Sequence, residues 1–228
     1  MAVRPDDELV ISYLALRKFI GILGILFPLI LMAGARLVFH QGFQPSLSDY
    51  YHTGMRDVFV GILWAIGVFL VSYHGYDKRD DIAGDLACLF AVGLSVCPVA
   101  TAGGTGEERT IGEIHFAFAA AFFAVLIYFS LFLFVKSKQG PRPVGRKAVR
   151  NRYYRVCGWV MAACVAGIAV FKGALGNQWV QDHYVVLILE TIAISAFGLS
   201  WLVKGEAILK DREDEHPAEM IATGTSGN

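Results

Sequence analysis

Charged residues are scarce in this sequence. Only 18% of its 228 residues are Asp, Glu, Lys or Arg, whereas 55% are hydrophobic, and the mean hydropathy is +0.51. Soluble domains typically contain about 25% charged residues, so the composition predicts an integral membrane protein. The formal net charge is zero. Because nucleic-acid-binding domains carry an excess of positive charge, we expect no nucleic-acid partner.

The sequence also lacks the paired motifs that are typical of metal or disulfide chemistry. Its four cysteines include no CxxC pair, and all of them lie inside apolar runs, where a thiol behaves as a small apolar side chain. Neither HExxH nor HxxxH occurs. We find no internal repeat and no segment with the composition of a soluble domain.

Long apolar runs, by contrast, are frequent. A spanning helix needs about 20 mostly apolar residues, and windows of that length predict an all-α, polytopic membrane protein with a six-transmembrane-helix bundle. The six spans are expected near residues 19–39, 56–75, 83–102, 113–135, 156–174 and 184–203. Pro98 lies in the third span and is expected to kink it. The predicted organisation is a cytoplasmic N-terminal segment (1–18), the six-span domain (19–205) and a charged, then polar cytoplasmic tail (206–228) that is expected to be disordered.

The distribution of Lys and Arg predicts the orientation of these spans. Sixteen of the 20 lie at one end of the six-span arrangement, namely Arg4, Arg17, Lys18, Lys78, Arg79, the eight between Lys136 and Arg155, Lys204, Lys210 and Arg212. We therefore expect both termini in the cytoplasm and the loops near 40–54, 103–112 and 175–182 outside. The basic segment 136–155 is expected to lie beside anionic lipid headgroups, with a specific anionic-lipid or protein site as the alternative.

Ionisable residues gather in the outer half of the predicted bundle. Because such groups are costly inside a membrane and mark pairing or function, we expect one outward-facing polar pocket there. The candidate pocket residues are Arg36, Asp49, His52, Arg56, Asp57, Glu113, His115, Lys172, His183 and Glu190. Glu190 lies seven residues, or about 10 Å, from the outer end of its helix. It should therefore pair with a cation such as Lys172 or Arg36, take a proton, or line a wet cavity.

Three functions fit these residues. The first is binding, transport or sensing of a lipid headgroup or small polar ligand in the pocket. The second is an intramembrane metal-dependent hydrolase acting on a lipid amide or ester, with His52, His115, His183 and Asp57 as candidate zinc ligands. The third is a structural or assembly subunit whose charges pair among themselves. The sequence leaves open the ligand, the metal content, the oligomeric state and whether the protein is an enzyme.

Three segments carry a resemblance to known families: "SLSDYYHTGMRDVFVGIL" after the first span, "EIHFAFAAAFF" opening the fourth, and "LETIAISAFGLSWLVKG" in the last. Together they resemble bacterial six-span membrane families of unknown function and, more remotely, the DRAM-like (damage-regulated autophagy modulator) group. The resemblance implies a six-helix fold in a bacterial inner (plasma) membrane. It also implies polar residues on the outer face, at Ser48, Asp49, Arg56, Asp57, His115 and Glu190. It implies no biochemical activity.

A second comparison concerns the ceramidase–adiponectin-receptor superfamily of membrane hydrolases. Ser48 and His52 are similar to its Ser-x-x-x-His pattern. The chain departs from that superfamily because its last span has no HxxxH pair and because it has six predicted spans rather than seven. Both departures count against a zinc amidase.

Overall fold

The computed structural model of the chain describes residues 5–75, 77–101, 103–136 and 145–209. All regular secondary structure in this part of the chain is helical. The elements are α1 (Pro5–Leu37), η1 (Ser48–His52), α2 (Arg56–Val71), α3 (Lys78–Val96), α4 (Gly106–Tyr128), η2 (Phe129–Leu133), α5 (Gly145–Leu175), α6 (Asn177–Asp182) and α7 (Val185–Lys204). The prediction of an all-α protein is confirmed.

Four helical segments are long and apolar enough to cross a membrane: Tyr13–Leu37, Gly106–Leu133, Gly145–Leu175 and Val185–Lys204. They correspond to the first, fourth, fifth and sixth predicted spans, and they support the prediction of an integral membrane protein. The other two predicted spans are also helical. However, α2 has only 16 residues, and α3 opens with the charged sequence Lys78-Arg79-Asp80-Asp81.

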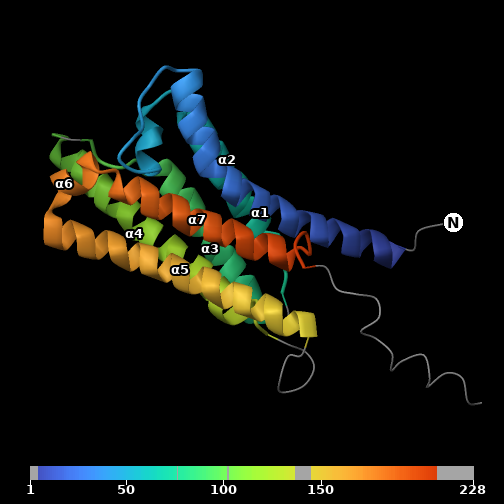
Figure 1. The fold of residues 1–228 in the computed structure, drawn as a ribbon. Coiled ribbons are helices and arrows are strands. Elements are labelled where there is room, and N and C mark those ends of the chain that lie inside the picture. Colours follow the sequence, from blue (N-terminus) through green and yellow to red (C-terminus); the bar gives the residue numbers. More distant parts are fainter. Residues whose placement is uncertain (1–4, 76, 102, 137–144, 210–228) are drawn as a thin grey trace, which may run out of the picture.

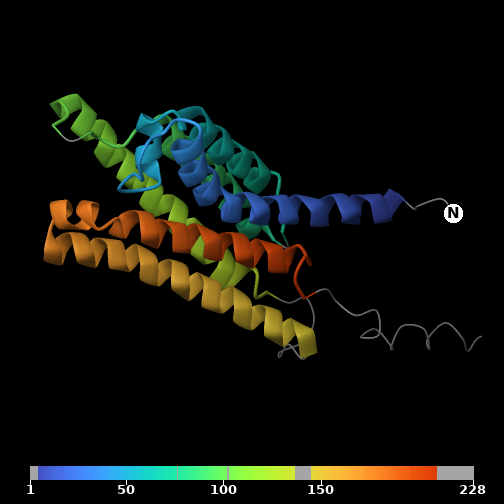
Figure 2. The ribbon, with the colours of Figure 1, turned by 45° about the horizontal axis from the view of Figure 1, so that its top comes forward.

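The long helices run alternately up and down in one bundle. α7 packs extensively against both α1 and α5, and a second group is formed by α2 with α3 and by α3 with α4. α5 and α7 lie side by side along their lengths in both views (Figures 1 and 2). We call the end where α1 begins and α7 ends the terminal end. The opposite end, which carries residues 38–55, 97–101 and 103–105 and α6, is the loop end.

Several helix ends differ from the predicted spans. α1 begins at Pro5 and α5 at Gly145, because a helix can continue past the apolar run that crosses a membrane. The first part of α1 extends beyond the other helices in Figure 1. Residues 1–4 and 210–228, which include most of the predicted tail, lie outside the described residues.

The kink expected at Pro98 is wrong. α3 ends at Val96, and Cys97 already has extended backbone angles. The reason is local: a proline ring clashes with a helical conformation of the residue before it, so a helix tends to end ahead of an X–Pro pair. Pro98 therefore belongs to the connection between α3 and α4.

Close backbone contact joins α1 to α7. A methyl group added at Gly198 would lie 2.6 Å from the carbonyl oxygen of Gly21, and one added at Gly24 would lie 3.1 Å from the Cα of Gly198. Small residues are used in this way in membrane helices because they let backbones approach and gain dispersion contacts. The α1–α7 pair thus depends on glycine at the crossing point.

Aromatic side chains fill the core near the terminal end. The Trp201 ring is fully buried, and its centroid lies 5.0 Å from those of Tyr73 and Phe134, both edge-on. Phe129 and Phe197 complete the cluster. Edge-to-face pairs of this kind add to the dispersion energy of burial, and here they join α7 to η2 and to the end of α2.

Candidate functional site

The loop after α1 folds back into the loop end of the bundle. The backbone N–H of Leu187, in the first turn of α7, donates to the carbonyl oxygen of Pro45 at 3.0 Å. Two residues further along the loop, the N–H of Leu47 donates to Glu190 Oε2 at 2.7 Å. Leu47, Ser48 and their neighbours on this segment are buried. The loop is therefore fixed to α7 through backbone groups.

Glu190 thus has a backbone amide as its partner. The sequence suggested a cation, a proton or a wet cavity for this carboxylate, with Lys172 and Arg36 as possible cations. Arg36 is exposed at the end of α1, and Lys172 Nζ lies 4.5 Å from the centre of the Phe116 ring. The carboxylate also borders a cavity of about 30 Å³ with mostly apolar walls, which is room for about one water molecule.

Two histidines hold the connection after α3. His115 on α4 is buried, and its Nδ1 lies 2.6 Å from the carbonyl oxygen of Cys97. His52 in η1 places Nε2 2.7 Å from the carbonyl oxygen of Val99. Because a carbonyl oxygen only accepts, both ring nitrogens act as donors here. The two rings therefore satisfy carbonyl groups that the end of α3 and Pro98 leave without helical partners.

Asp49 also makes a local contact. Its Oδ2 accepts from Ser46 Oγ at 2.6 Å, and its backbone N–H donates back to the same hydroxyl oxygen at 3.2 Å. This reciprocal pair closes a tight turn at the start of η1. Like His52, His115 and Glu190, Asp49 shapes the folded loop.

Arg56 and Asp57 have a different setting. They lie in the first turn of α2 and line a hollow of about 630 Å³ together with Tyr51, Val60, Gly61, Trp64, Ser95 and Val96. Arg56 Nη2 donates to the Tyr51 hydroxyl at 2.6 Å, and its guanidinium lies 4.4 Å from the centre of that ring. The exposed Asp57 carboxylate has no hydrogen-bond or ion-pair partner among the described residues. We call this feature the α2 hollow.

The remaining candidates lie elsewhere at the loop end. Arg36 and Glu113 are exposed. His183 is exposed as well; it stacks on Trp179 with ring centroids 4.1 Å apart, and its Nδ1 lies 2.8 Å from the Trp179 carbonyl oxygen. Of the ten candidates, Arg56 and Asp57 line the α2 hollow and Glu190 lines the 30 Å³ cavity. The other seven candidates line neither of these two cavities.

The candidate zinc ligands do not form a metal-binding group. Among the described residues, no group of three or more His, Cys, Asp or Glu side chains is close enough to hold a metal ion. His52 and His115 each use one ring nitrogen on a backbone carbonyl, whereas Asp57 lies on the α2 hollow. A catalytic zinc site normally needs three protein ligands around one point. The donor set therefore does not fit a metal hydrolase.

A charged cluster that we did not predict lies at the terminal end. Lys136 Nζ is 3.0 Å from Asp77 Oδ1 and 3.2 Å from Asp80 Oδ2, and the Asp80 side chain is buried. The hydrogen bond from Lys136 holds the pKa of Asp77 below its ordinary value. Partial burial by itself lowers the pKa of Lys136, but the hydrogen bonds to Asp77 and Asp80 outweigh it and raise this pKa. Asp77 and Asp80 also form a capping box at the start of α3.

Two of these features had a signal in the sequence. Trp64 follows Arg56 and Val60 at intervals of four residues, a spacing that places them on one helix face. The pattern Asp77-x-x-Asp80 resembles a capping box and indicates a helix start. Ser95 and Lys136 had no such signal, because their place in the structure depends on contacts with residues far away in the sequence.

Comparison with known proteins gives no match: no family model, no curated protein and no solved structure matches the chain. The resemblance to bacterial six-span families and to the DRAM-like group therefore stays a prediction.

Proposed function

We propose that this protein is a six-span membrane protein that binds the polar headgroup of a membrane lipid in the α2 hollow. The observation that carries the proposal is the pairing of Arg56 and Asp57 on the wall of this 630 Å³ hollow, with the Asp57 carboxylate unpartnered among the described residues. A cation and an anion side by side suit a ligand that carries both charges. Zwitterionic phospholipids, with a phosphate and an amine, have this pattern.

The charges of Arg56 and Asp57 would match those of a zwitterionic phospholipid one by one. The Arg56 guanidinium presents several N–H donors in a plane, and the bond to Tyr51 uses only part of them. The remaining donors can meet phosphate oxygens in a forked arrangement. Asp57 can accept hydrogen bonds from an ammonium group.

The apolar part of the same ligand would lie along α2. Trp64 is half-exposed and lies seven residues beyond Asp57, which is about 10 Å along a helix axis. Tryptophan is enriched at membrane interfaces because its ring is apolar and its N–H is polar. Val60, Gly61 and Val96 complete a wall against which the start of an acyl chain can pack.

The six-span arrangement with both termini in the cytoplasm, within a bacterial inner membrane, is part of this proposal. It is supported by the alternation of the helices and by the excess of Lys and Arg at the terminal end. In this six-span arrangement, the α2 hollow opens at the outer surface of the membrane. The hydrolase alternative is not proposed, because no three of its candidate ligands form a metal-binding group among the described residues.

The test is lipid retention by the purified, full-length protein. Wild type, R56Q/D57N and R36Q/E113Q would be purified in mild detergent, and co-purifying phospholipid would be quantified by mass spectrometry. The R36Q/E113Q control changes the same types of charge at the same end of the bundle, but away from the hollow. We expect R56Q/D57N to retain about ten-fold less zwitterionic phospholipid, which corresponds to about 1.4 kcal/mol.

Two results would contradict the proposal. One is equal retention by R56Q/D57N and wild type. The other is an equal loss in R56Q/D57N and R36Q/E113Q, which would indicate a general effect of charge at the membrane surface. Thermal unfolding in the same detergent would verify that all three proteins are folded.

A further inference from the structure

A second hollow lies on α5, toward the terminal end. It has a volume of about 640 Å³ and is lined by Ala148, Asn151, Arg152, Arg155, Val156, Trp159, Val160 and Ala163. These residues recur at intervals of three and four along α5 and therefore share one broad face. Asn151 is buried at its edge and donates from Nδ2 to the carbonyl oxygen of Val135, which fixes this face relative to the end of η2. We call the feature the α5 hollow.

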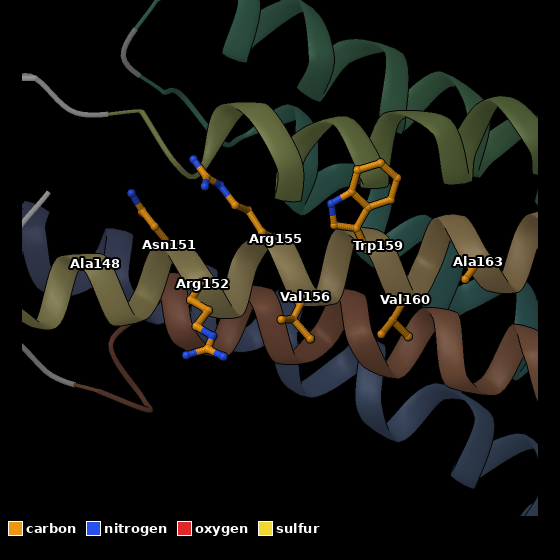
Figure 3. Close-up of a pocket in the computed structure, with 8 residues that line it drawn as sticks. All are labelled: Ala148, Asn151, Arg152, Arg155, Val156, Trp159, Val160 and Ala163. Atoms are coloured by element: carbon orange, nitrogen blue, oxygen red, sulfur yellow. The ribbon is translucent and has the colours of Figure 1, made fainter. Parts of the chain in front are cut away.

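The side chains of the α5 hollow change character along the helix. Arg152 and Arg155 lie at the end nearer the start of α5, and Val156, Trp159, Val160 and Ala163 follow. In Figure 3, Arg155 projects to the same side of α5 as Trp159, and Arg152 projects to the same side as Val156 and Val160. The two arginines thus project to opposite sides of α5 and flank the hollow (Figure 3). Ala148 and Ala163 lie at its two ends.

The charge of the α5 hollow is of one sign. Its eight lining residues include two arginines and no acid. Arg152 and Arg155 are both exposed, and neither has a hydrogen bond or ion pair with a described residue. Two unpaired cations on one wall attract an anion, and the missing carboxylate distinguishes this hollow from the α2 hollow, where Asp57 can meet an amine.

We propose that the α5 hollow binds an anionic phospholipid, with the phosphate held between Arg152 and Arg155 and an acyl chain along Val156, Trp159 and Val160. Guanidinium groups bind phosphate oxygens through two parallel hydrogen bonds. Trp159 lies one turn beyond Arg155, about 6 Å along the helix axis. The charged part of the lining is therefore followed by the apolar part within a distance similar to the length of a lipid headgroup. Basic pockets on the flank of membrane helices are suited to such lipids.

The occupant is a lipid rather than a free anion because most of the lining is apolar. Trp159 and Val156 are 67% and 53% exposed, on the helix that is among the four able to cross a membrane. A dissolved phosphate would leave these side chains uncovered. Isolated arginines near a helix end often extend to the membrane surface, but here two of them flank one hollow that continues into an apolar wall.

Native mass spectrometry of the full-length protein in detergent tests this site. Wild type would be incubated with dioleoyl phosphatidylglycerol or with dioleoyl phosphatidylcholine, which has the same chains but no net charge. We expect wild type to retain phosphatidylglycerol in preference. R152Q/R155Q should lower this retention about ten-fold or more, because charge-assisted hydrogen bonds are lost. K18Q/K78Q, which removes two cations at the terminal end outside the hollow, should retain it as wild type does.

Further variants separate the headgroup contact from the chain contact. R152K/R155K keeps both charges but loses the planar donors, so its retention should fall between those of wild type and R152Q/R155Q. W159A should weaken retention of the dioleoyl lipid several-fold with both arginines intact. If R152Q/R155Q fails to fold, the R152K/R155K and W159A variants still test the proposal.

Three results would overturn the proposal. Equal losses in R152Q/R155Q and K18Q/K78Q would indicate non-specific attraction to a basic surface. Equal retention of phosphatidylcholine and phosphatidylglycerol would exclude selection by charge. Displacement of the lipid by millimolar inorganic phosphate, with no effect of W159A, would mean that the site holds a free anion.

Discussion

Several ionisable side chains at the loop end of this bundle are held by backbone groups. Glu190 accepts from the N–H of Leu47, and His115 and His52 donate to the carbonyl groups of residues 97 and 99. Hydrogen bonds of this kind satisfy backbone groups that have no partner within a helix, and they fix a loop against a helix. Such side chains hold the loop end in place, whereas Arg56 and Asp57 face the α2 hollow and keep hydrogen-bonding capacity for a ligand.

The lysine of the terminal-end cluster gives the first prediction. Replacing Lys136 with Met removes an ion-pair partner of the buried Asp80 carboxylate, so we expect the protein to lose about 1–3 kcal/mol of stability at pH 7. Asp77 has a lowered pKa, so its contribution is present above the ordinary Asp pKa of about 4 and disappears as the pH falls through its lower folded value. Because the pKa of Lys136 is raised, the contribution of Lys136 to stability is present up to about pH 10 and is lost above that pH.

Thermal unfolding in detergent across this pH range is the measurement. The difference between wild type and K136M should be constant from about pH 5 to pH 9 and should shrink below about pH 4. The K78M control removes an exposed cation at the start of α3 and should change stability by less than about 0.5 kcal/mol. A difference between wild type and K136M that persists undiminished at pH 2 would exclude the ion pairs as its source.

At the scale of elements, the close pairing of α1 with α7 limits the size of the side chains that fit at their crossing point. The Cβ of alanine at position 198 would meet the Gly21 carbonyl oxygen at 2.6 Å and the Ile25 nitrogen at 2.8 Å. Both atoms belong to the backbone, so no side-chain rotation can relieve the contact. The helices would have to move apart along the crossing.

The second prediction concerns this crossing. We expect Gly198→Ala to destabilise the protein by about 1–3 kcal/mol, as overpacking of a close-packed interior does. Gly173→Ala is the matched control, because position 173 in α5 has open space around it. There the better helix propensity of alanine should leave stability unchanged or raise it by up to about 1 kcal/mol. Stabilisation by both substitutions in thermal unfolding would show that α1 and α7 are not in close contact.

Elements were more predictable than sites. Apolar runs identified the four helices that are long and apolar enough to cross a membrane, because a membrane helix must bury its backbone within a hydrophobic stretch. They also placed helices at α2 and α3. Their ends were less predictable: the polar start of α5 extends beyond the run, and Pro98 ends α3 early. The partners of Glu190 and Lys136 are 143 and 56 to 59 residues away in the sequence. No local spacing encodes such contacts, so the sequence indicated the depth of Glu190 along its helix but not which group would bind it.

At the scale of the whole molecule, the number of times that the chain crosses the membrane depends on α2 and α3. α2 has 16 residues, which span about 24 Å at 1.5 Å per residue, somewhat less than the 30 Å hydrocarbon core. If α2 and α3 both cross, residue 78 lies on the side opposite residue 42. If the pair folds back without crossing, residues 42 and 78 lie on the same side.

The last prediction follows from these two alternatives. In a variant without native cysteines, single cysteines at Gly42, Lys78 and Ile208 would be treated with a membrane-impermeant maleimide, on intact cells and then after permeabilisation. All three positions are exposed. Because the alternating helices and the basic terminal end favour six spans, we expect Gly42→Cys to react in intact cells, and Lys78→Cys and Ile208→Cys to react only afterwards. Reaction of residue 78 together with residue 42 would mean four crossings. It would also place both ends of α2 and α3 at one surface, where the α2 hollow could no longer lie along an acyl chain.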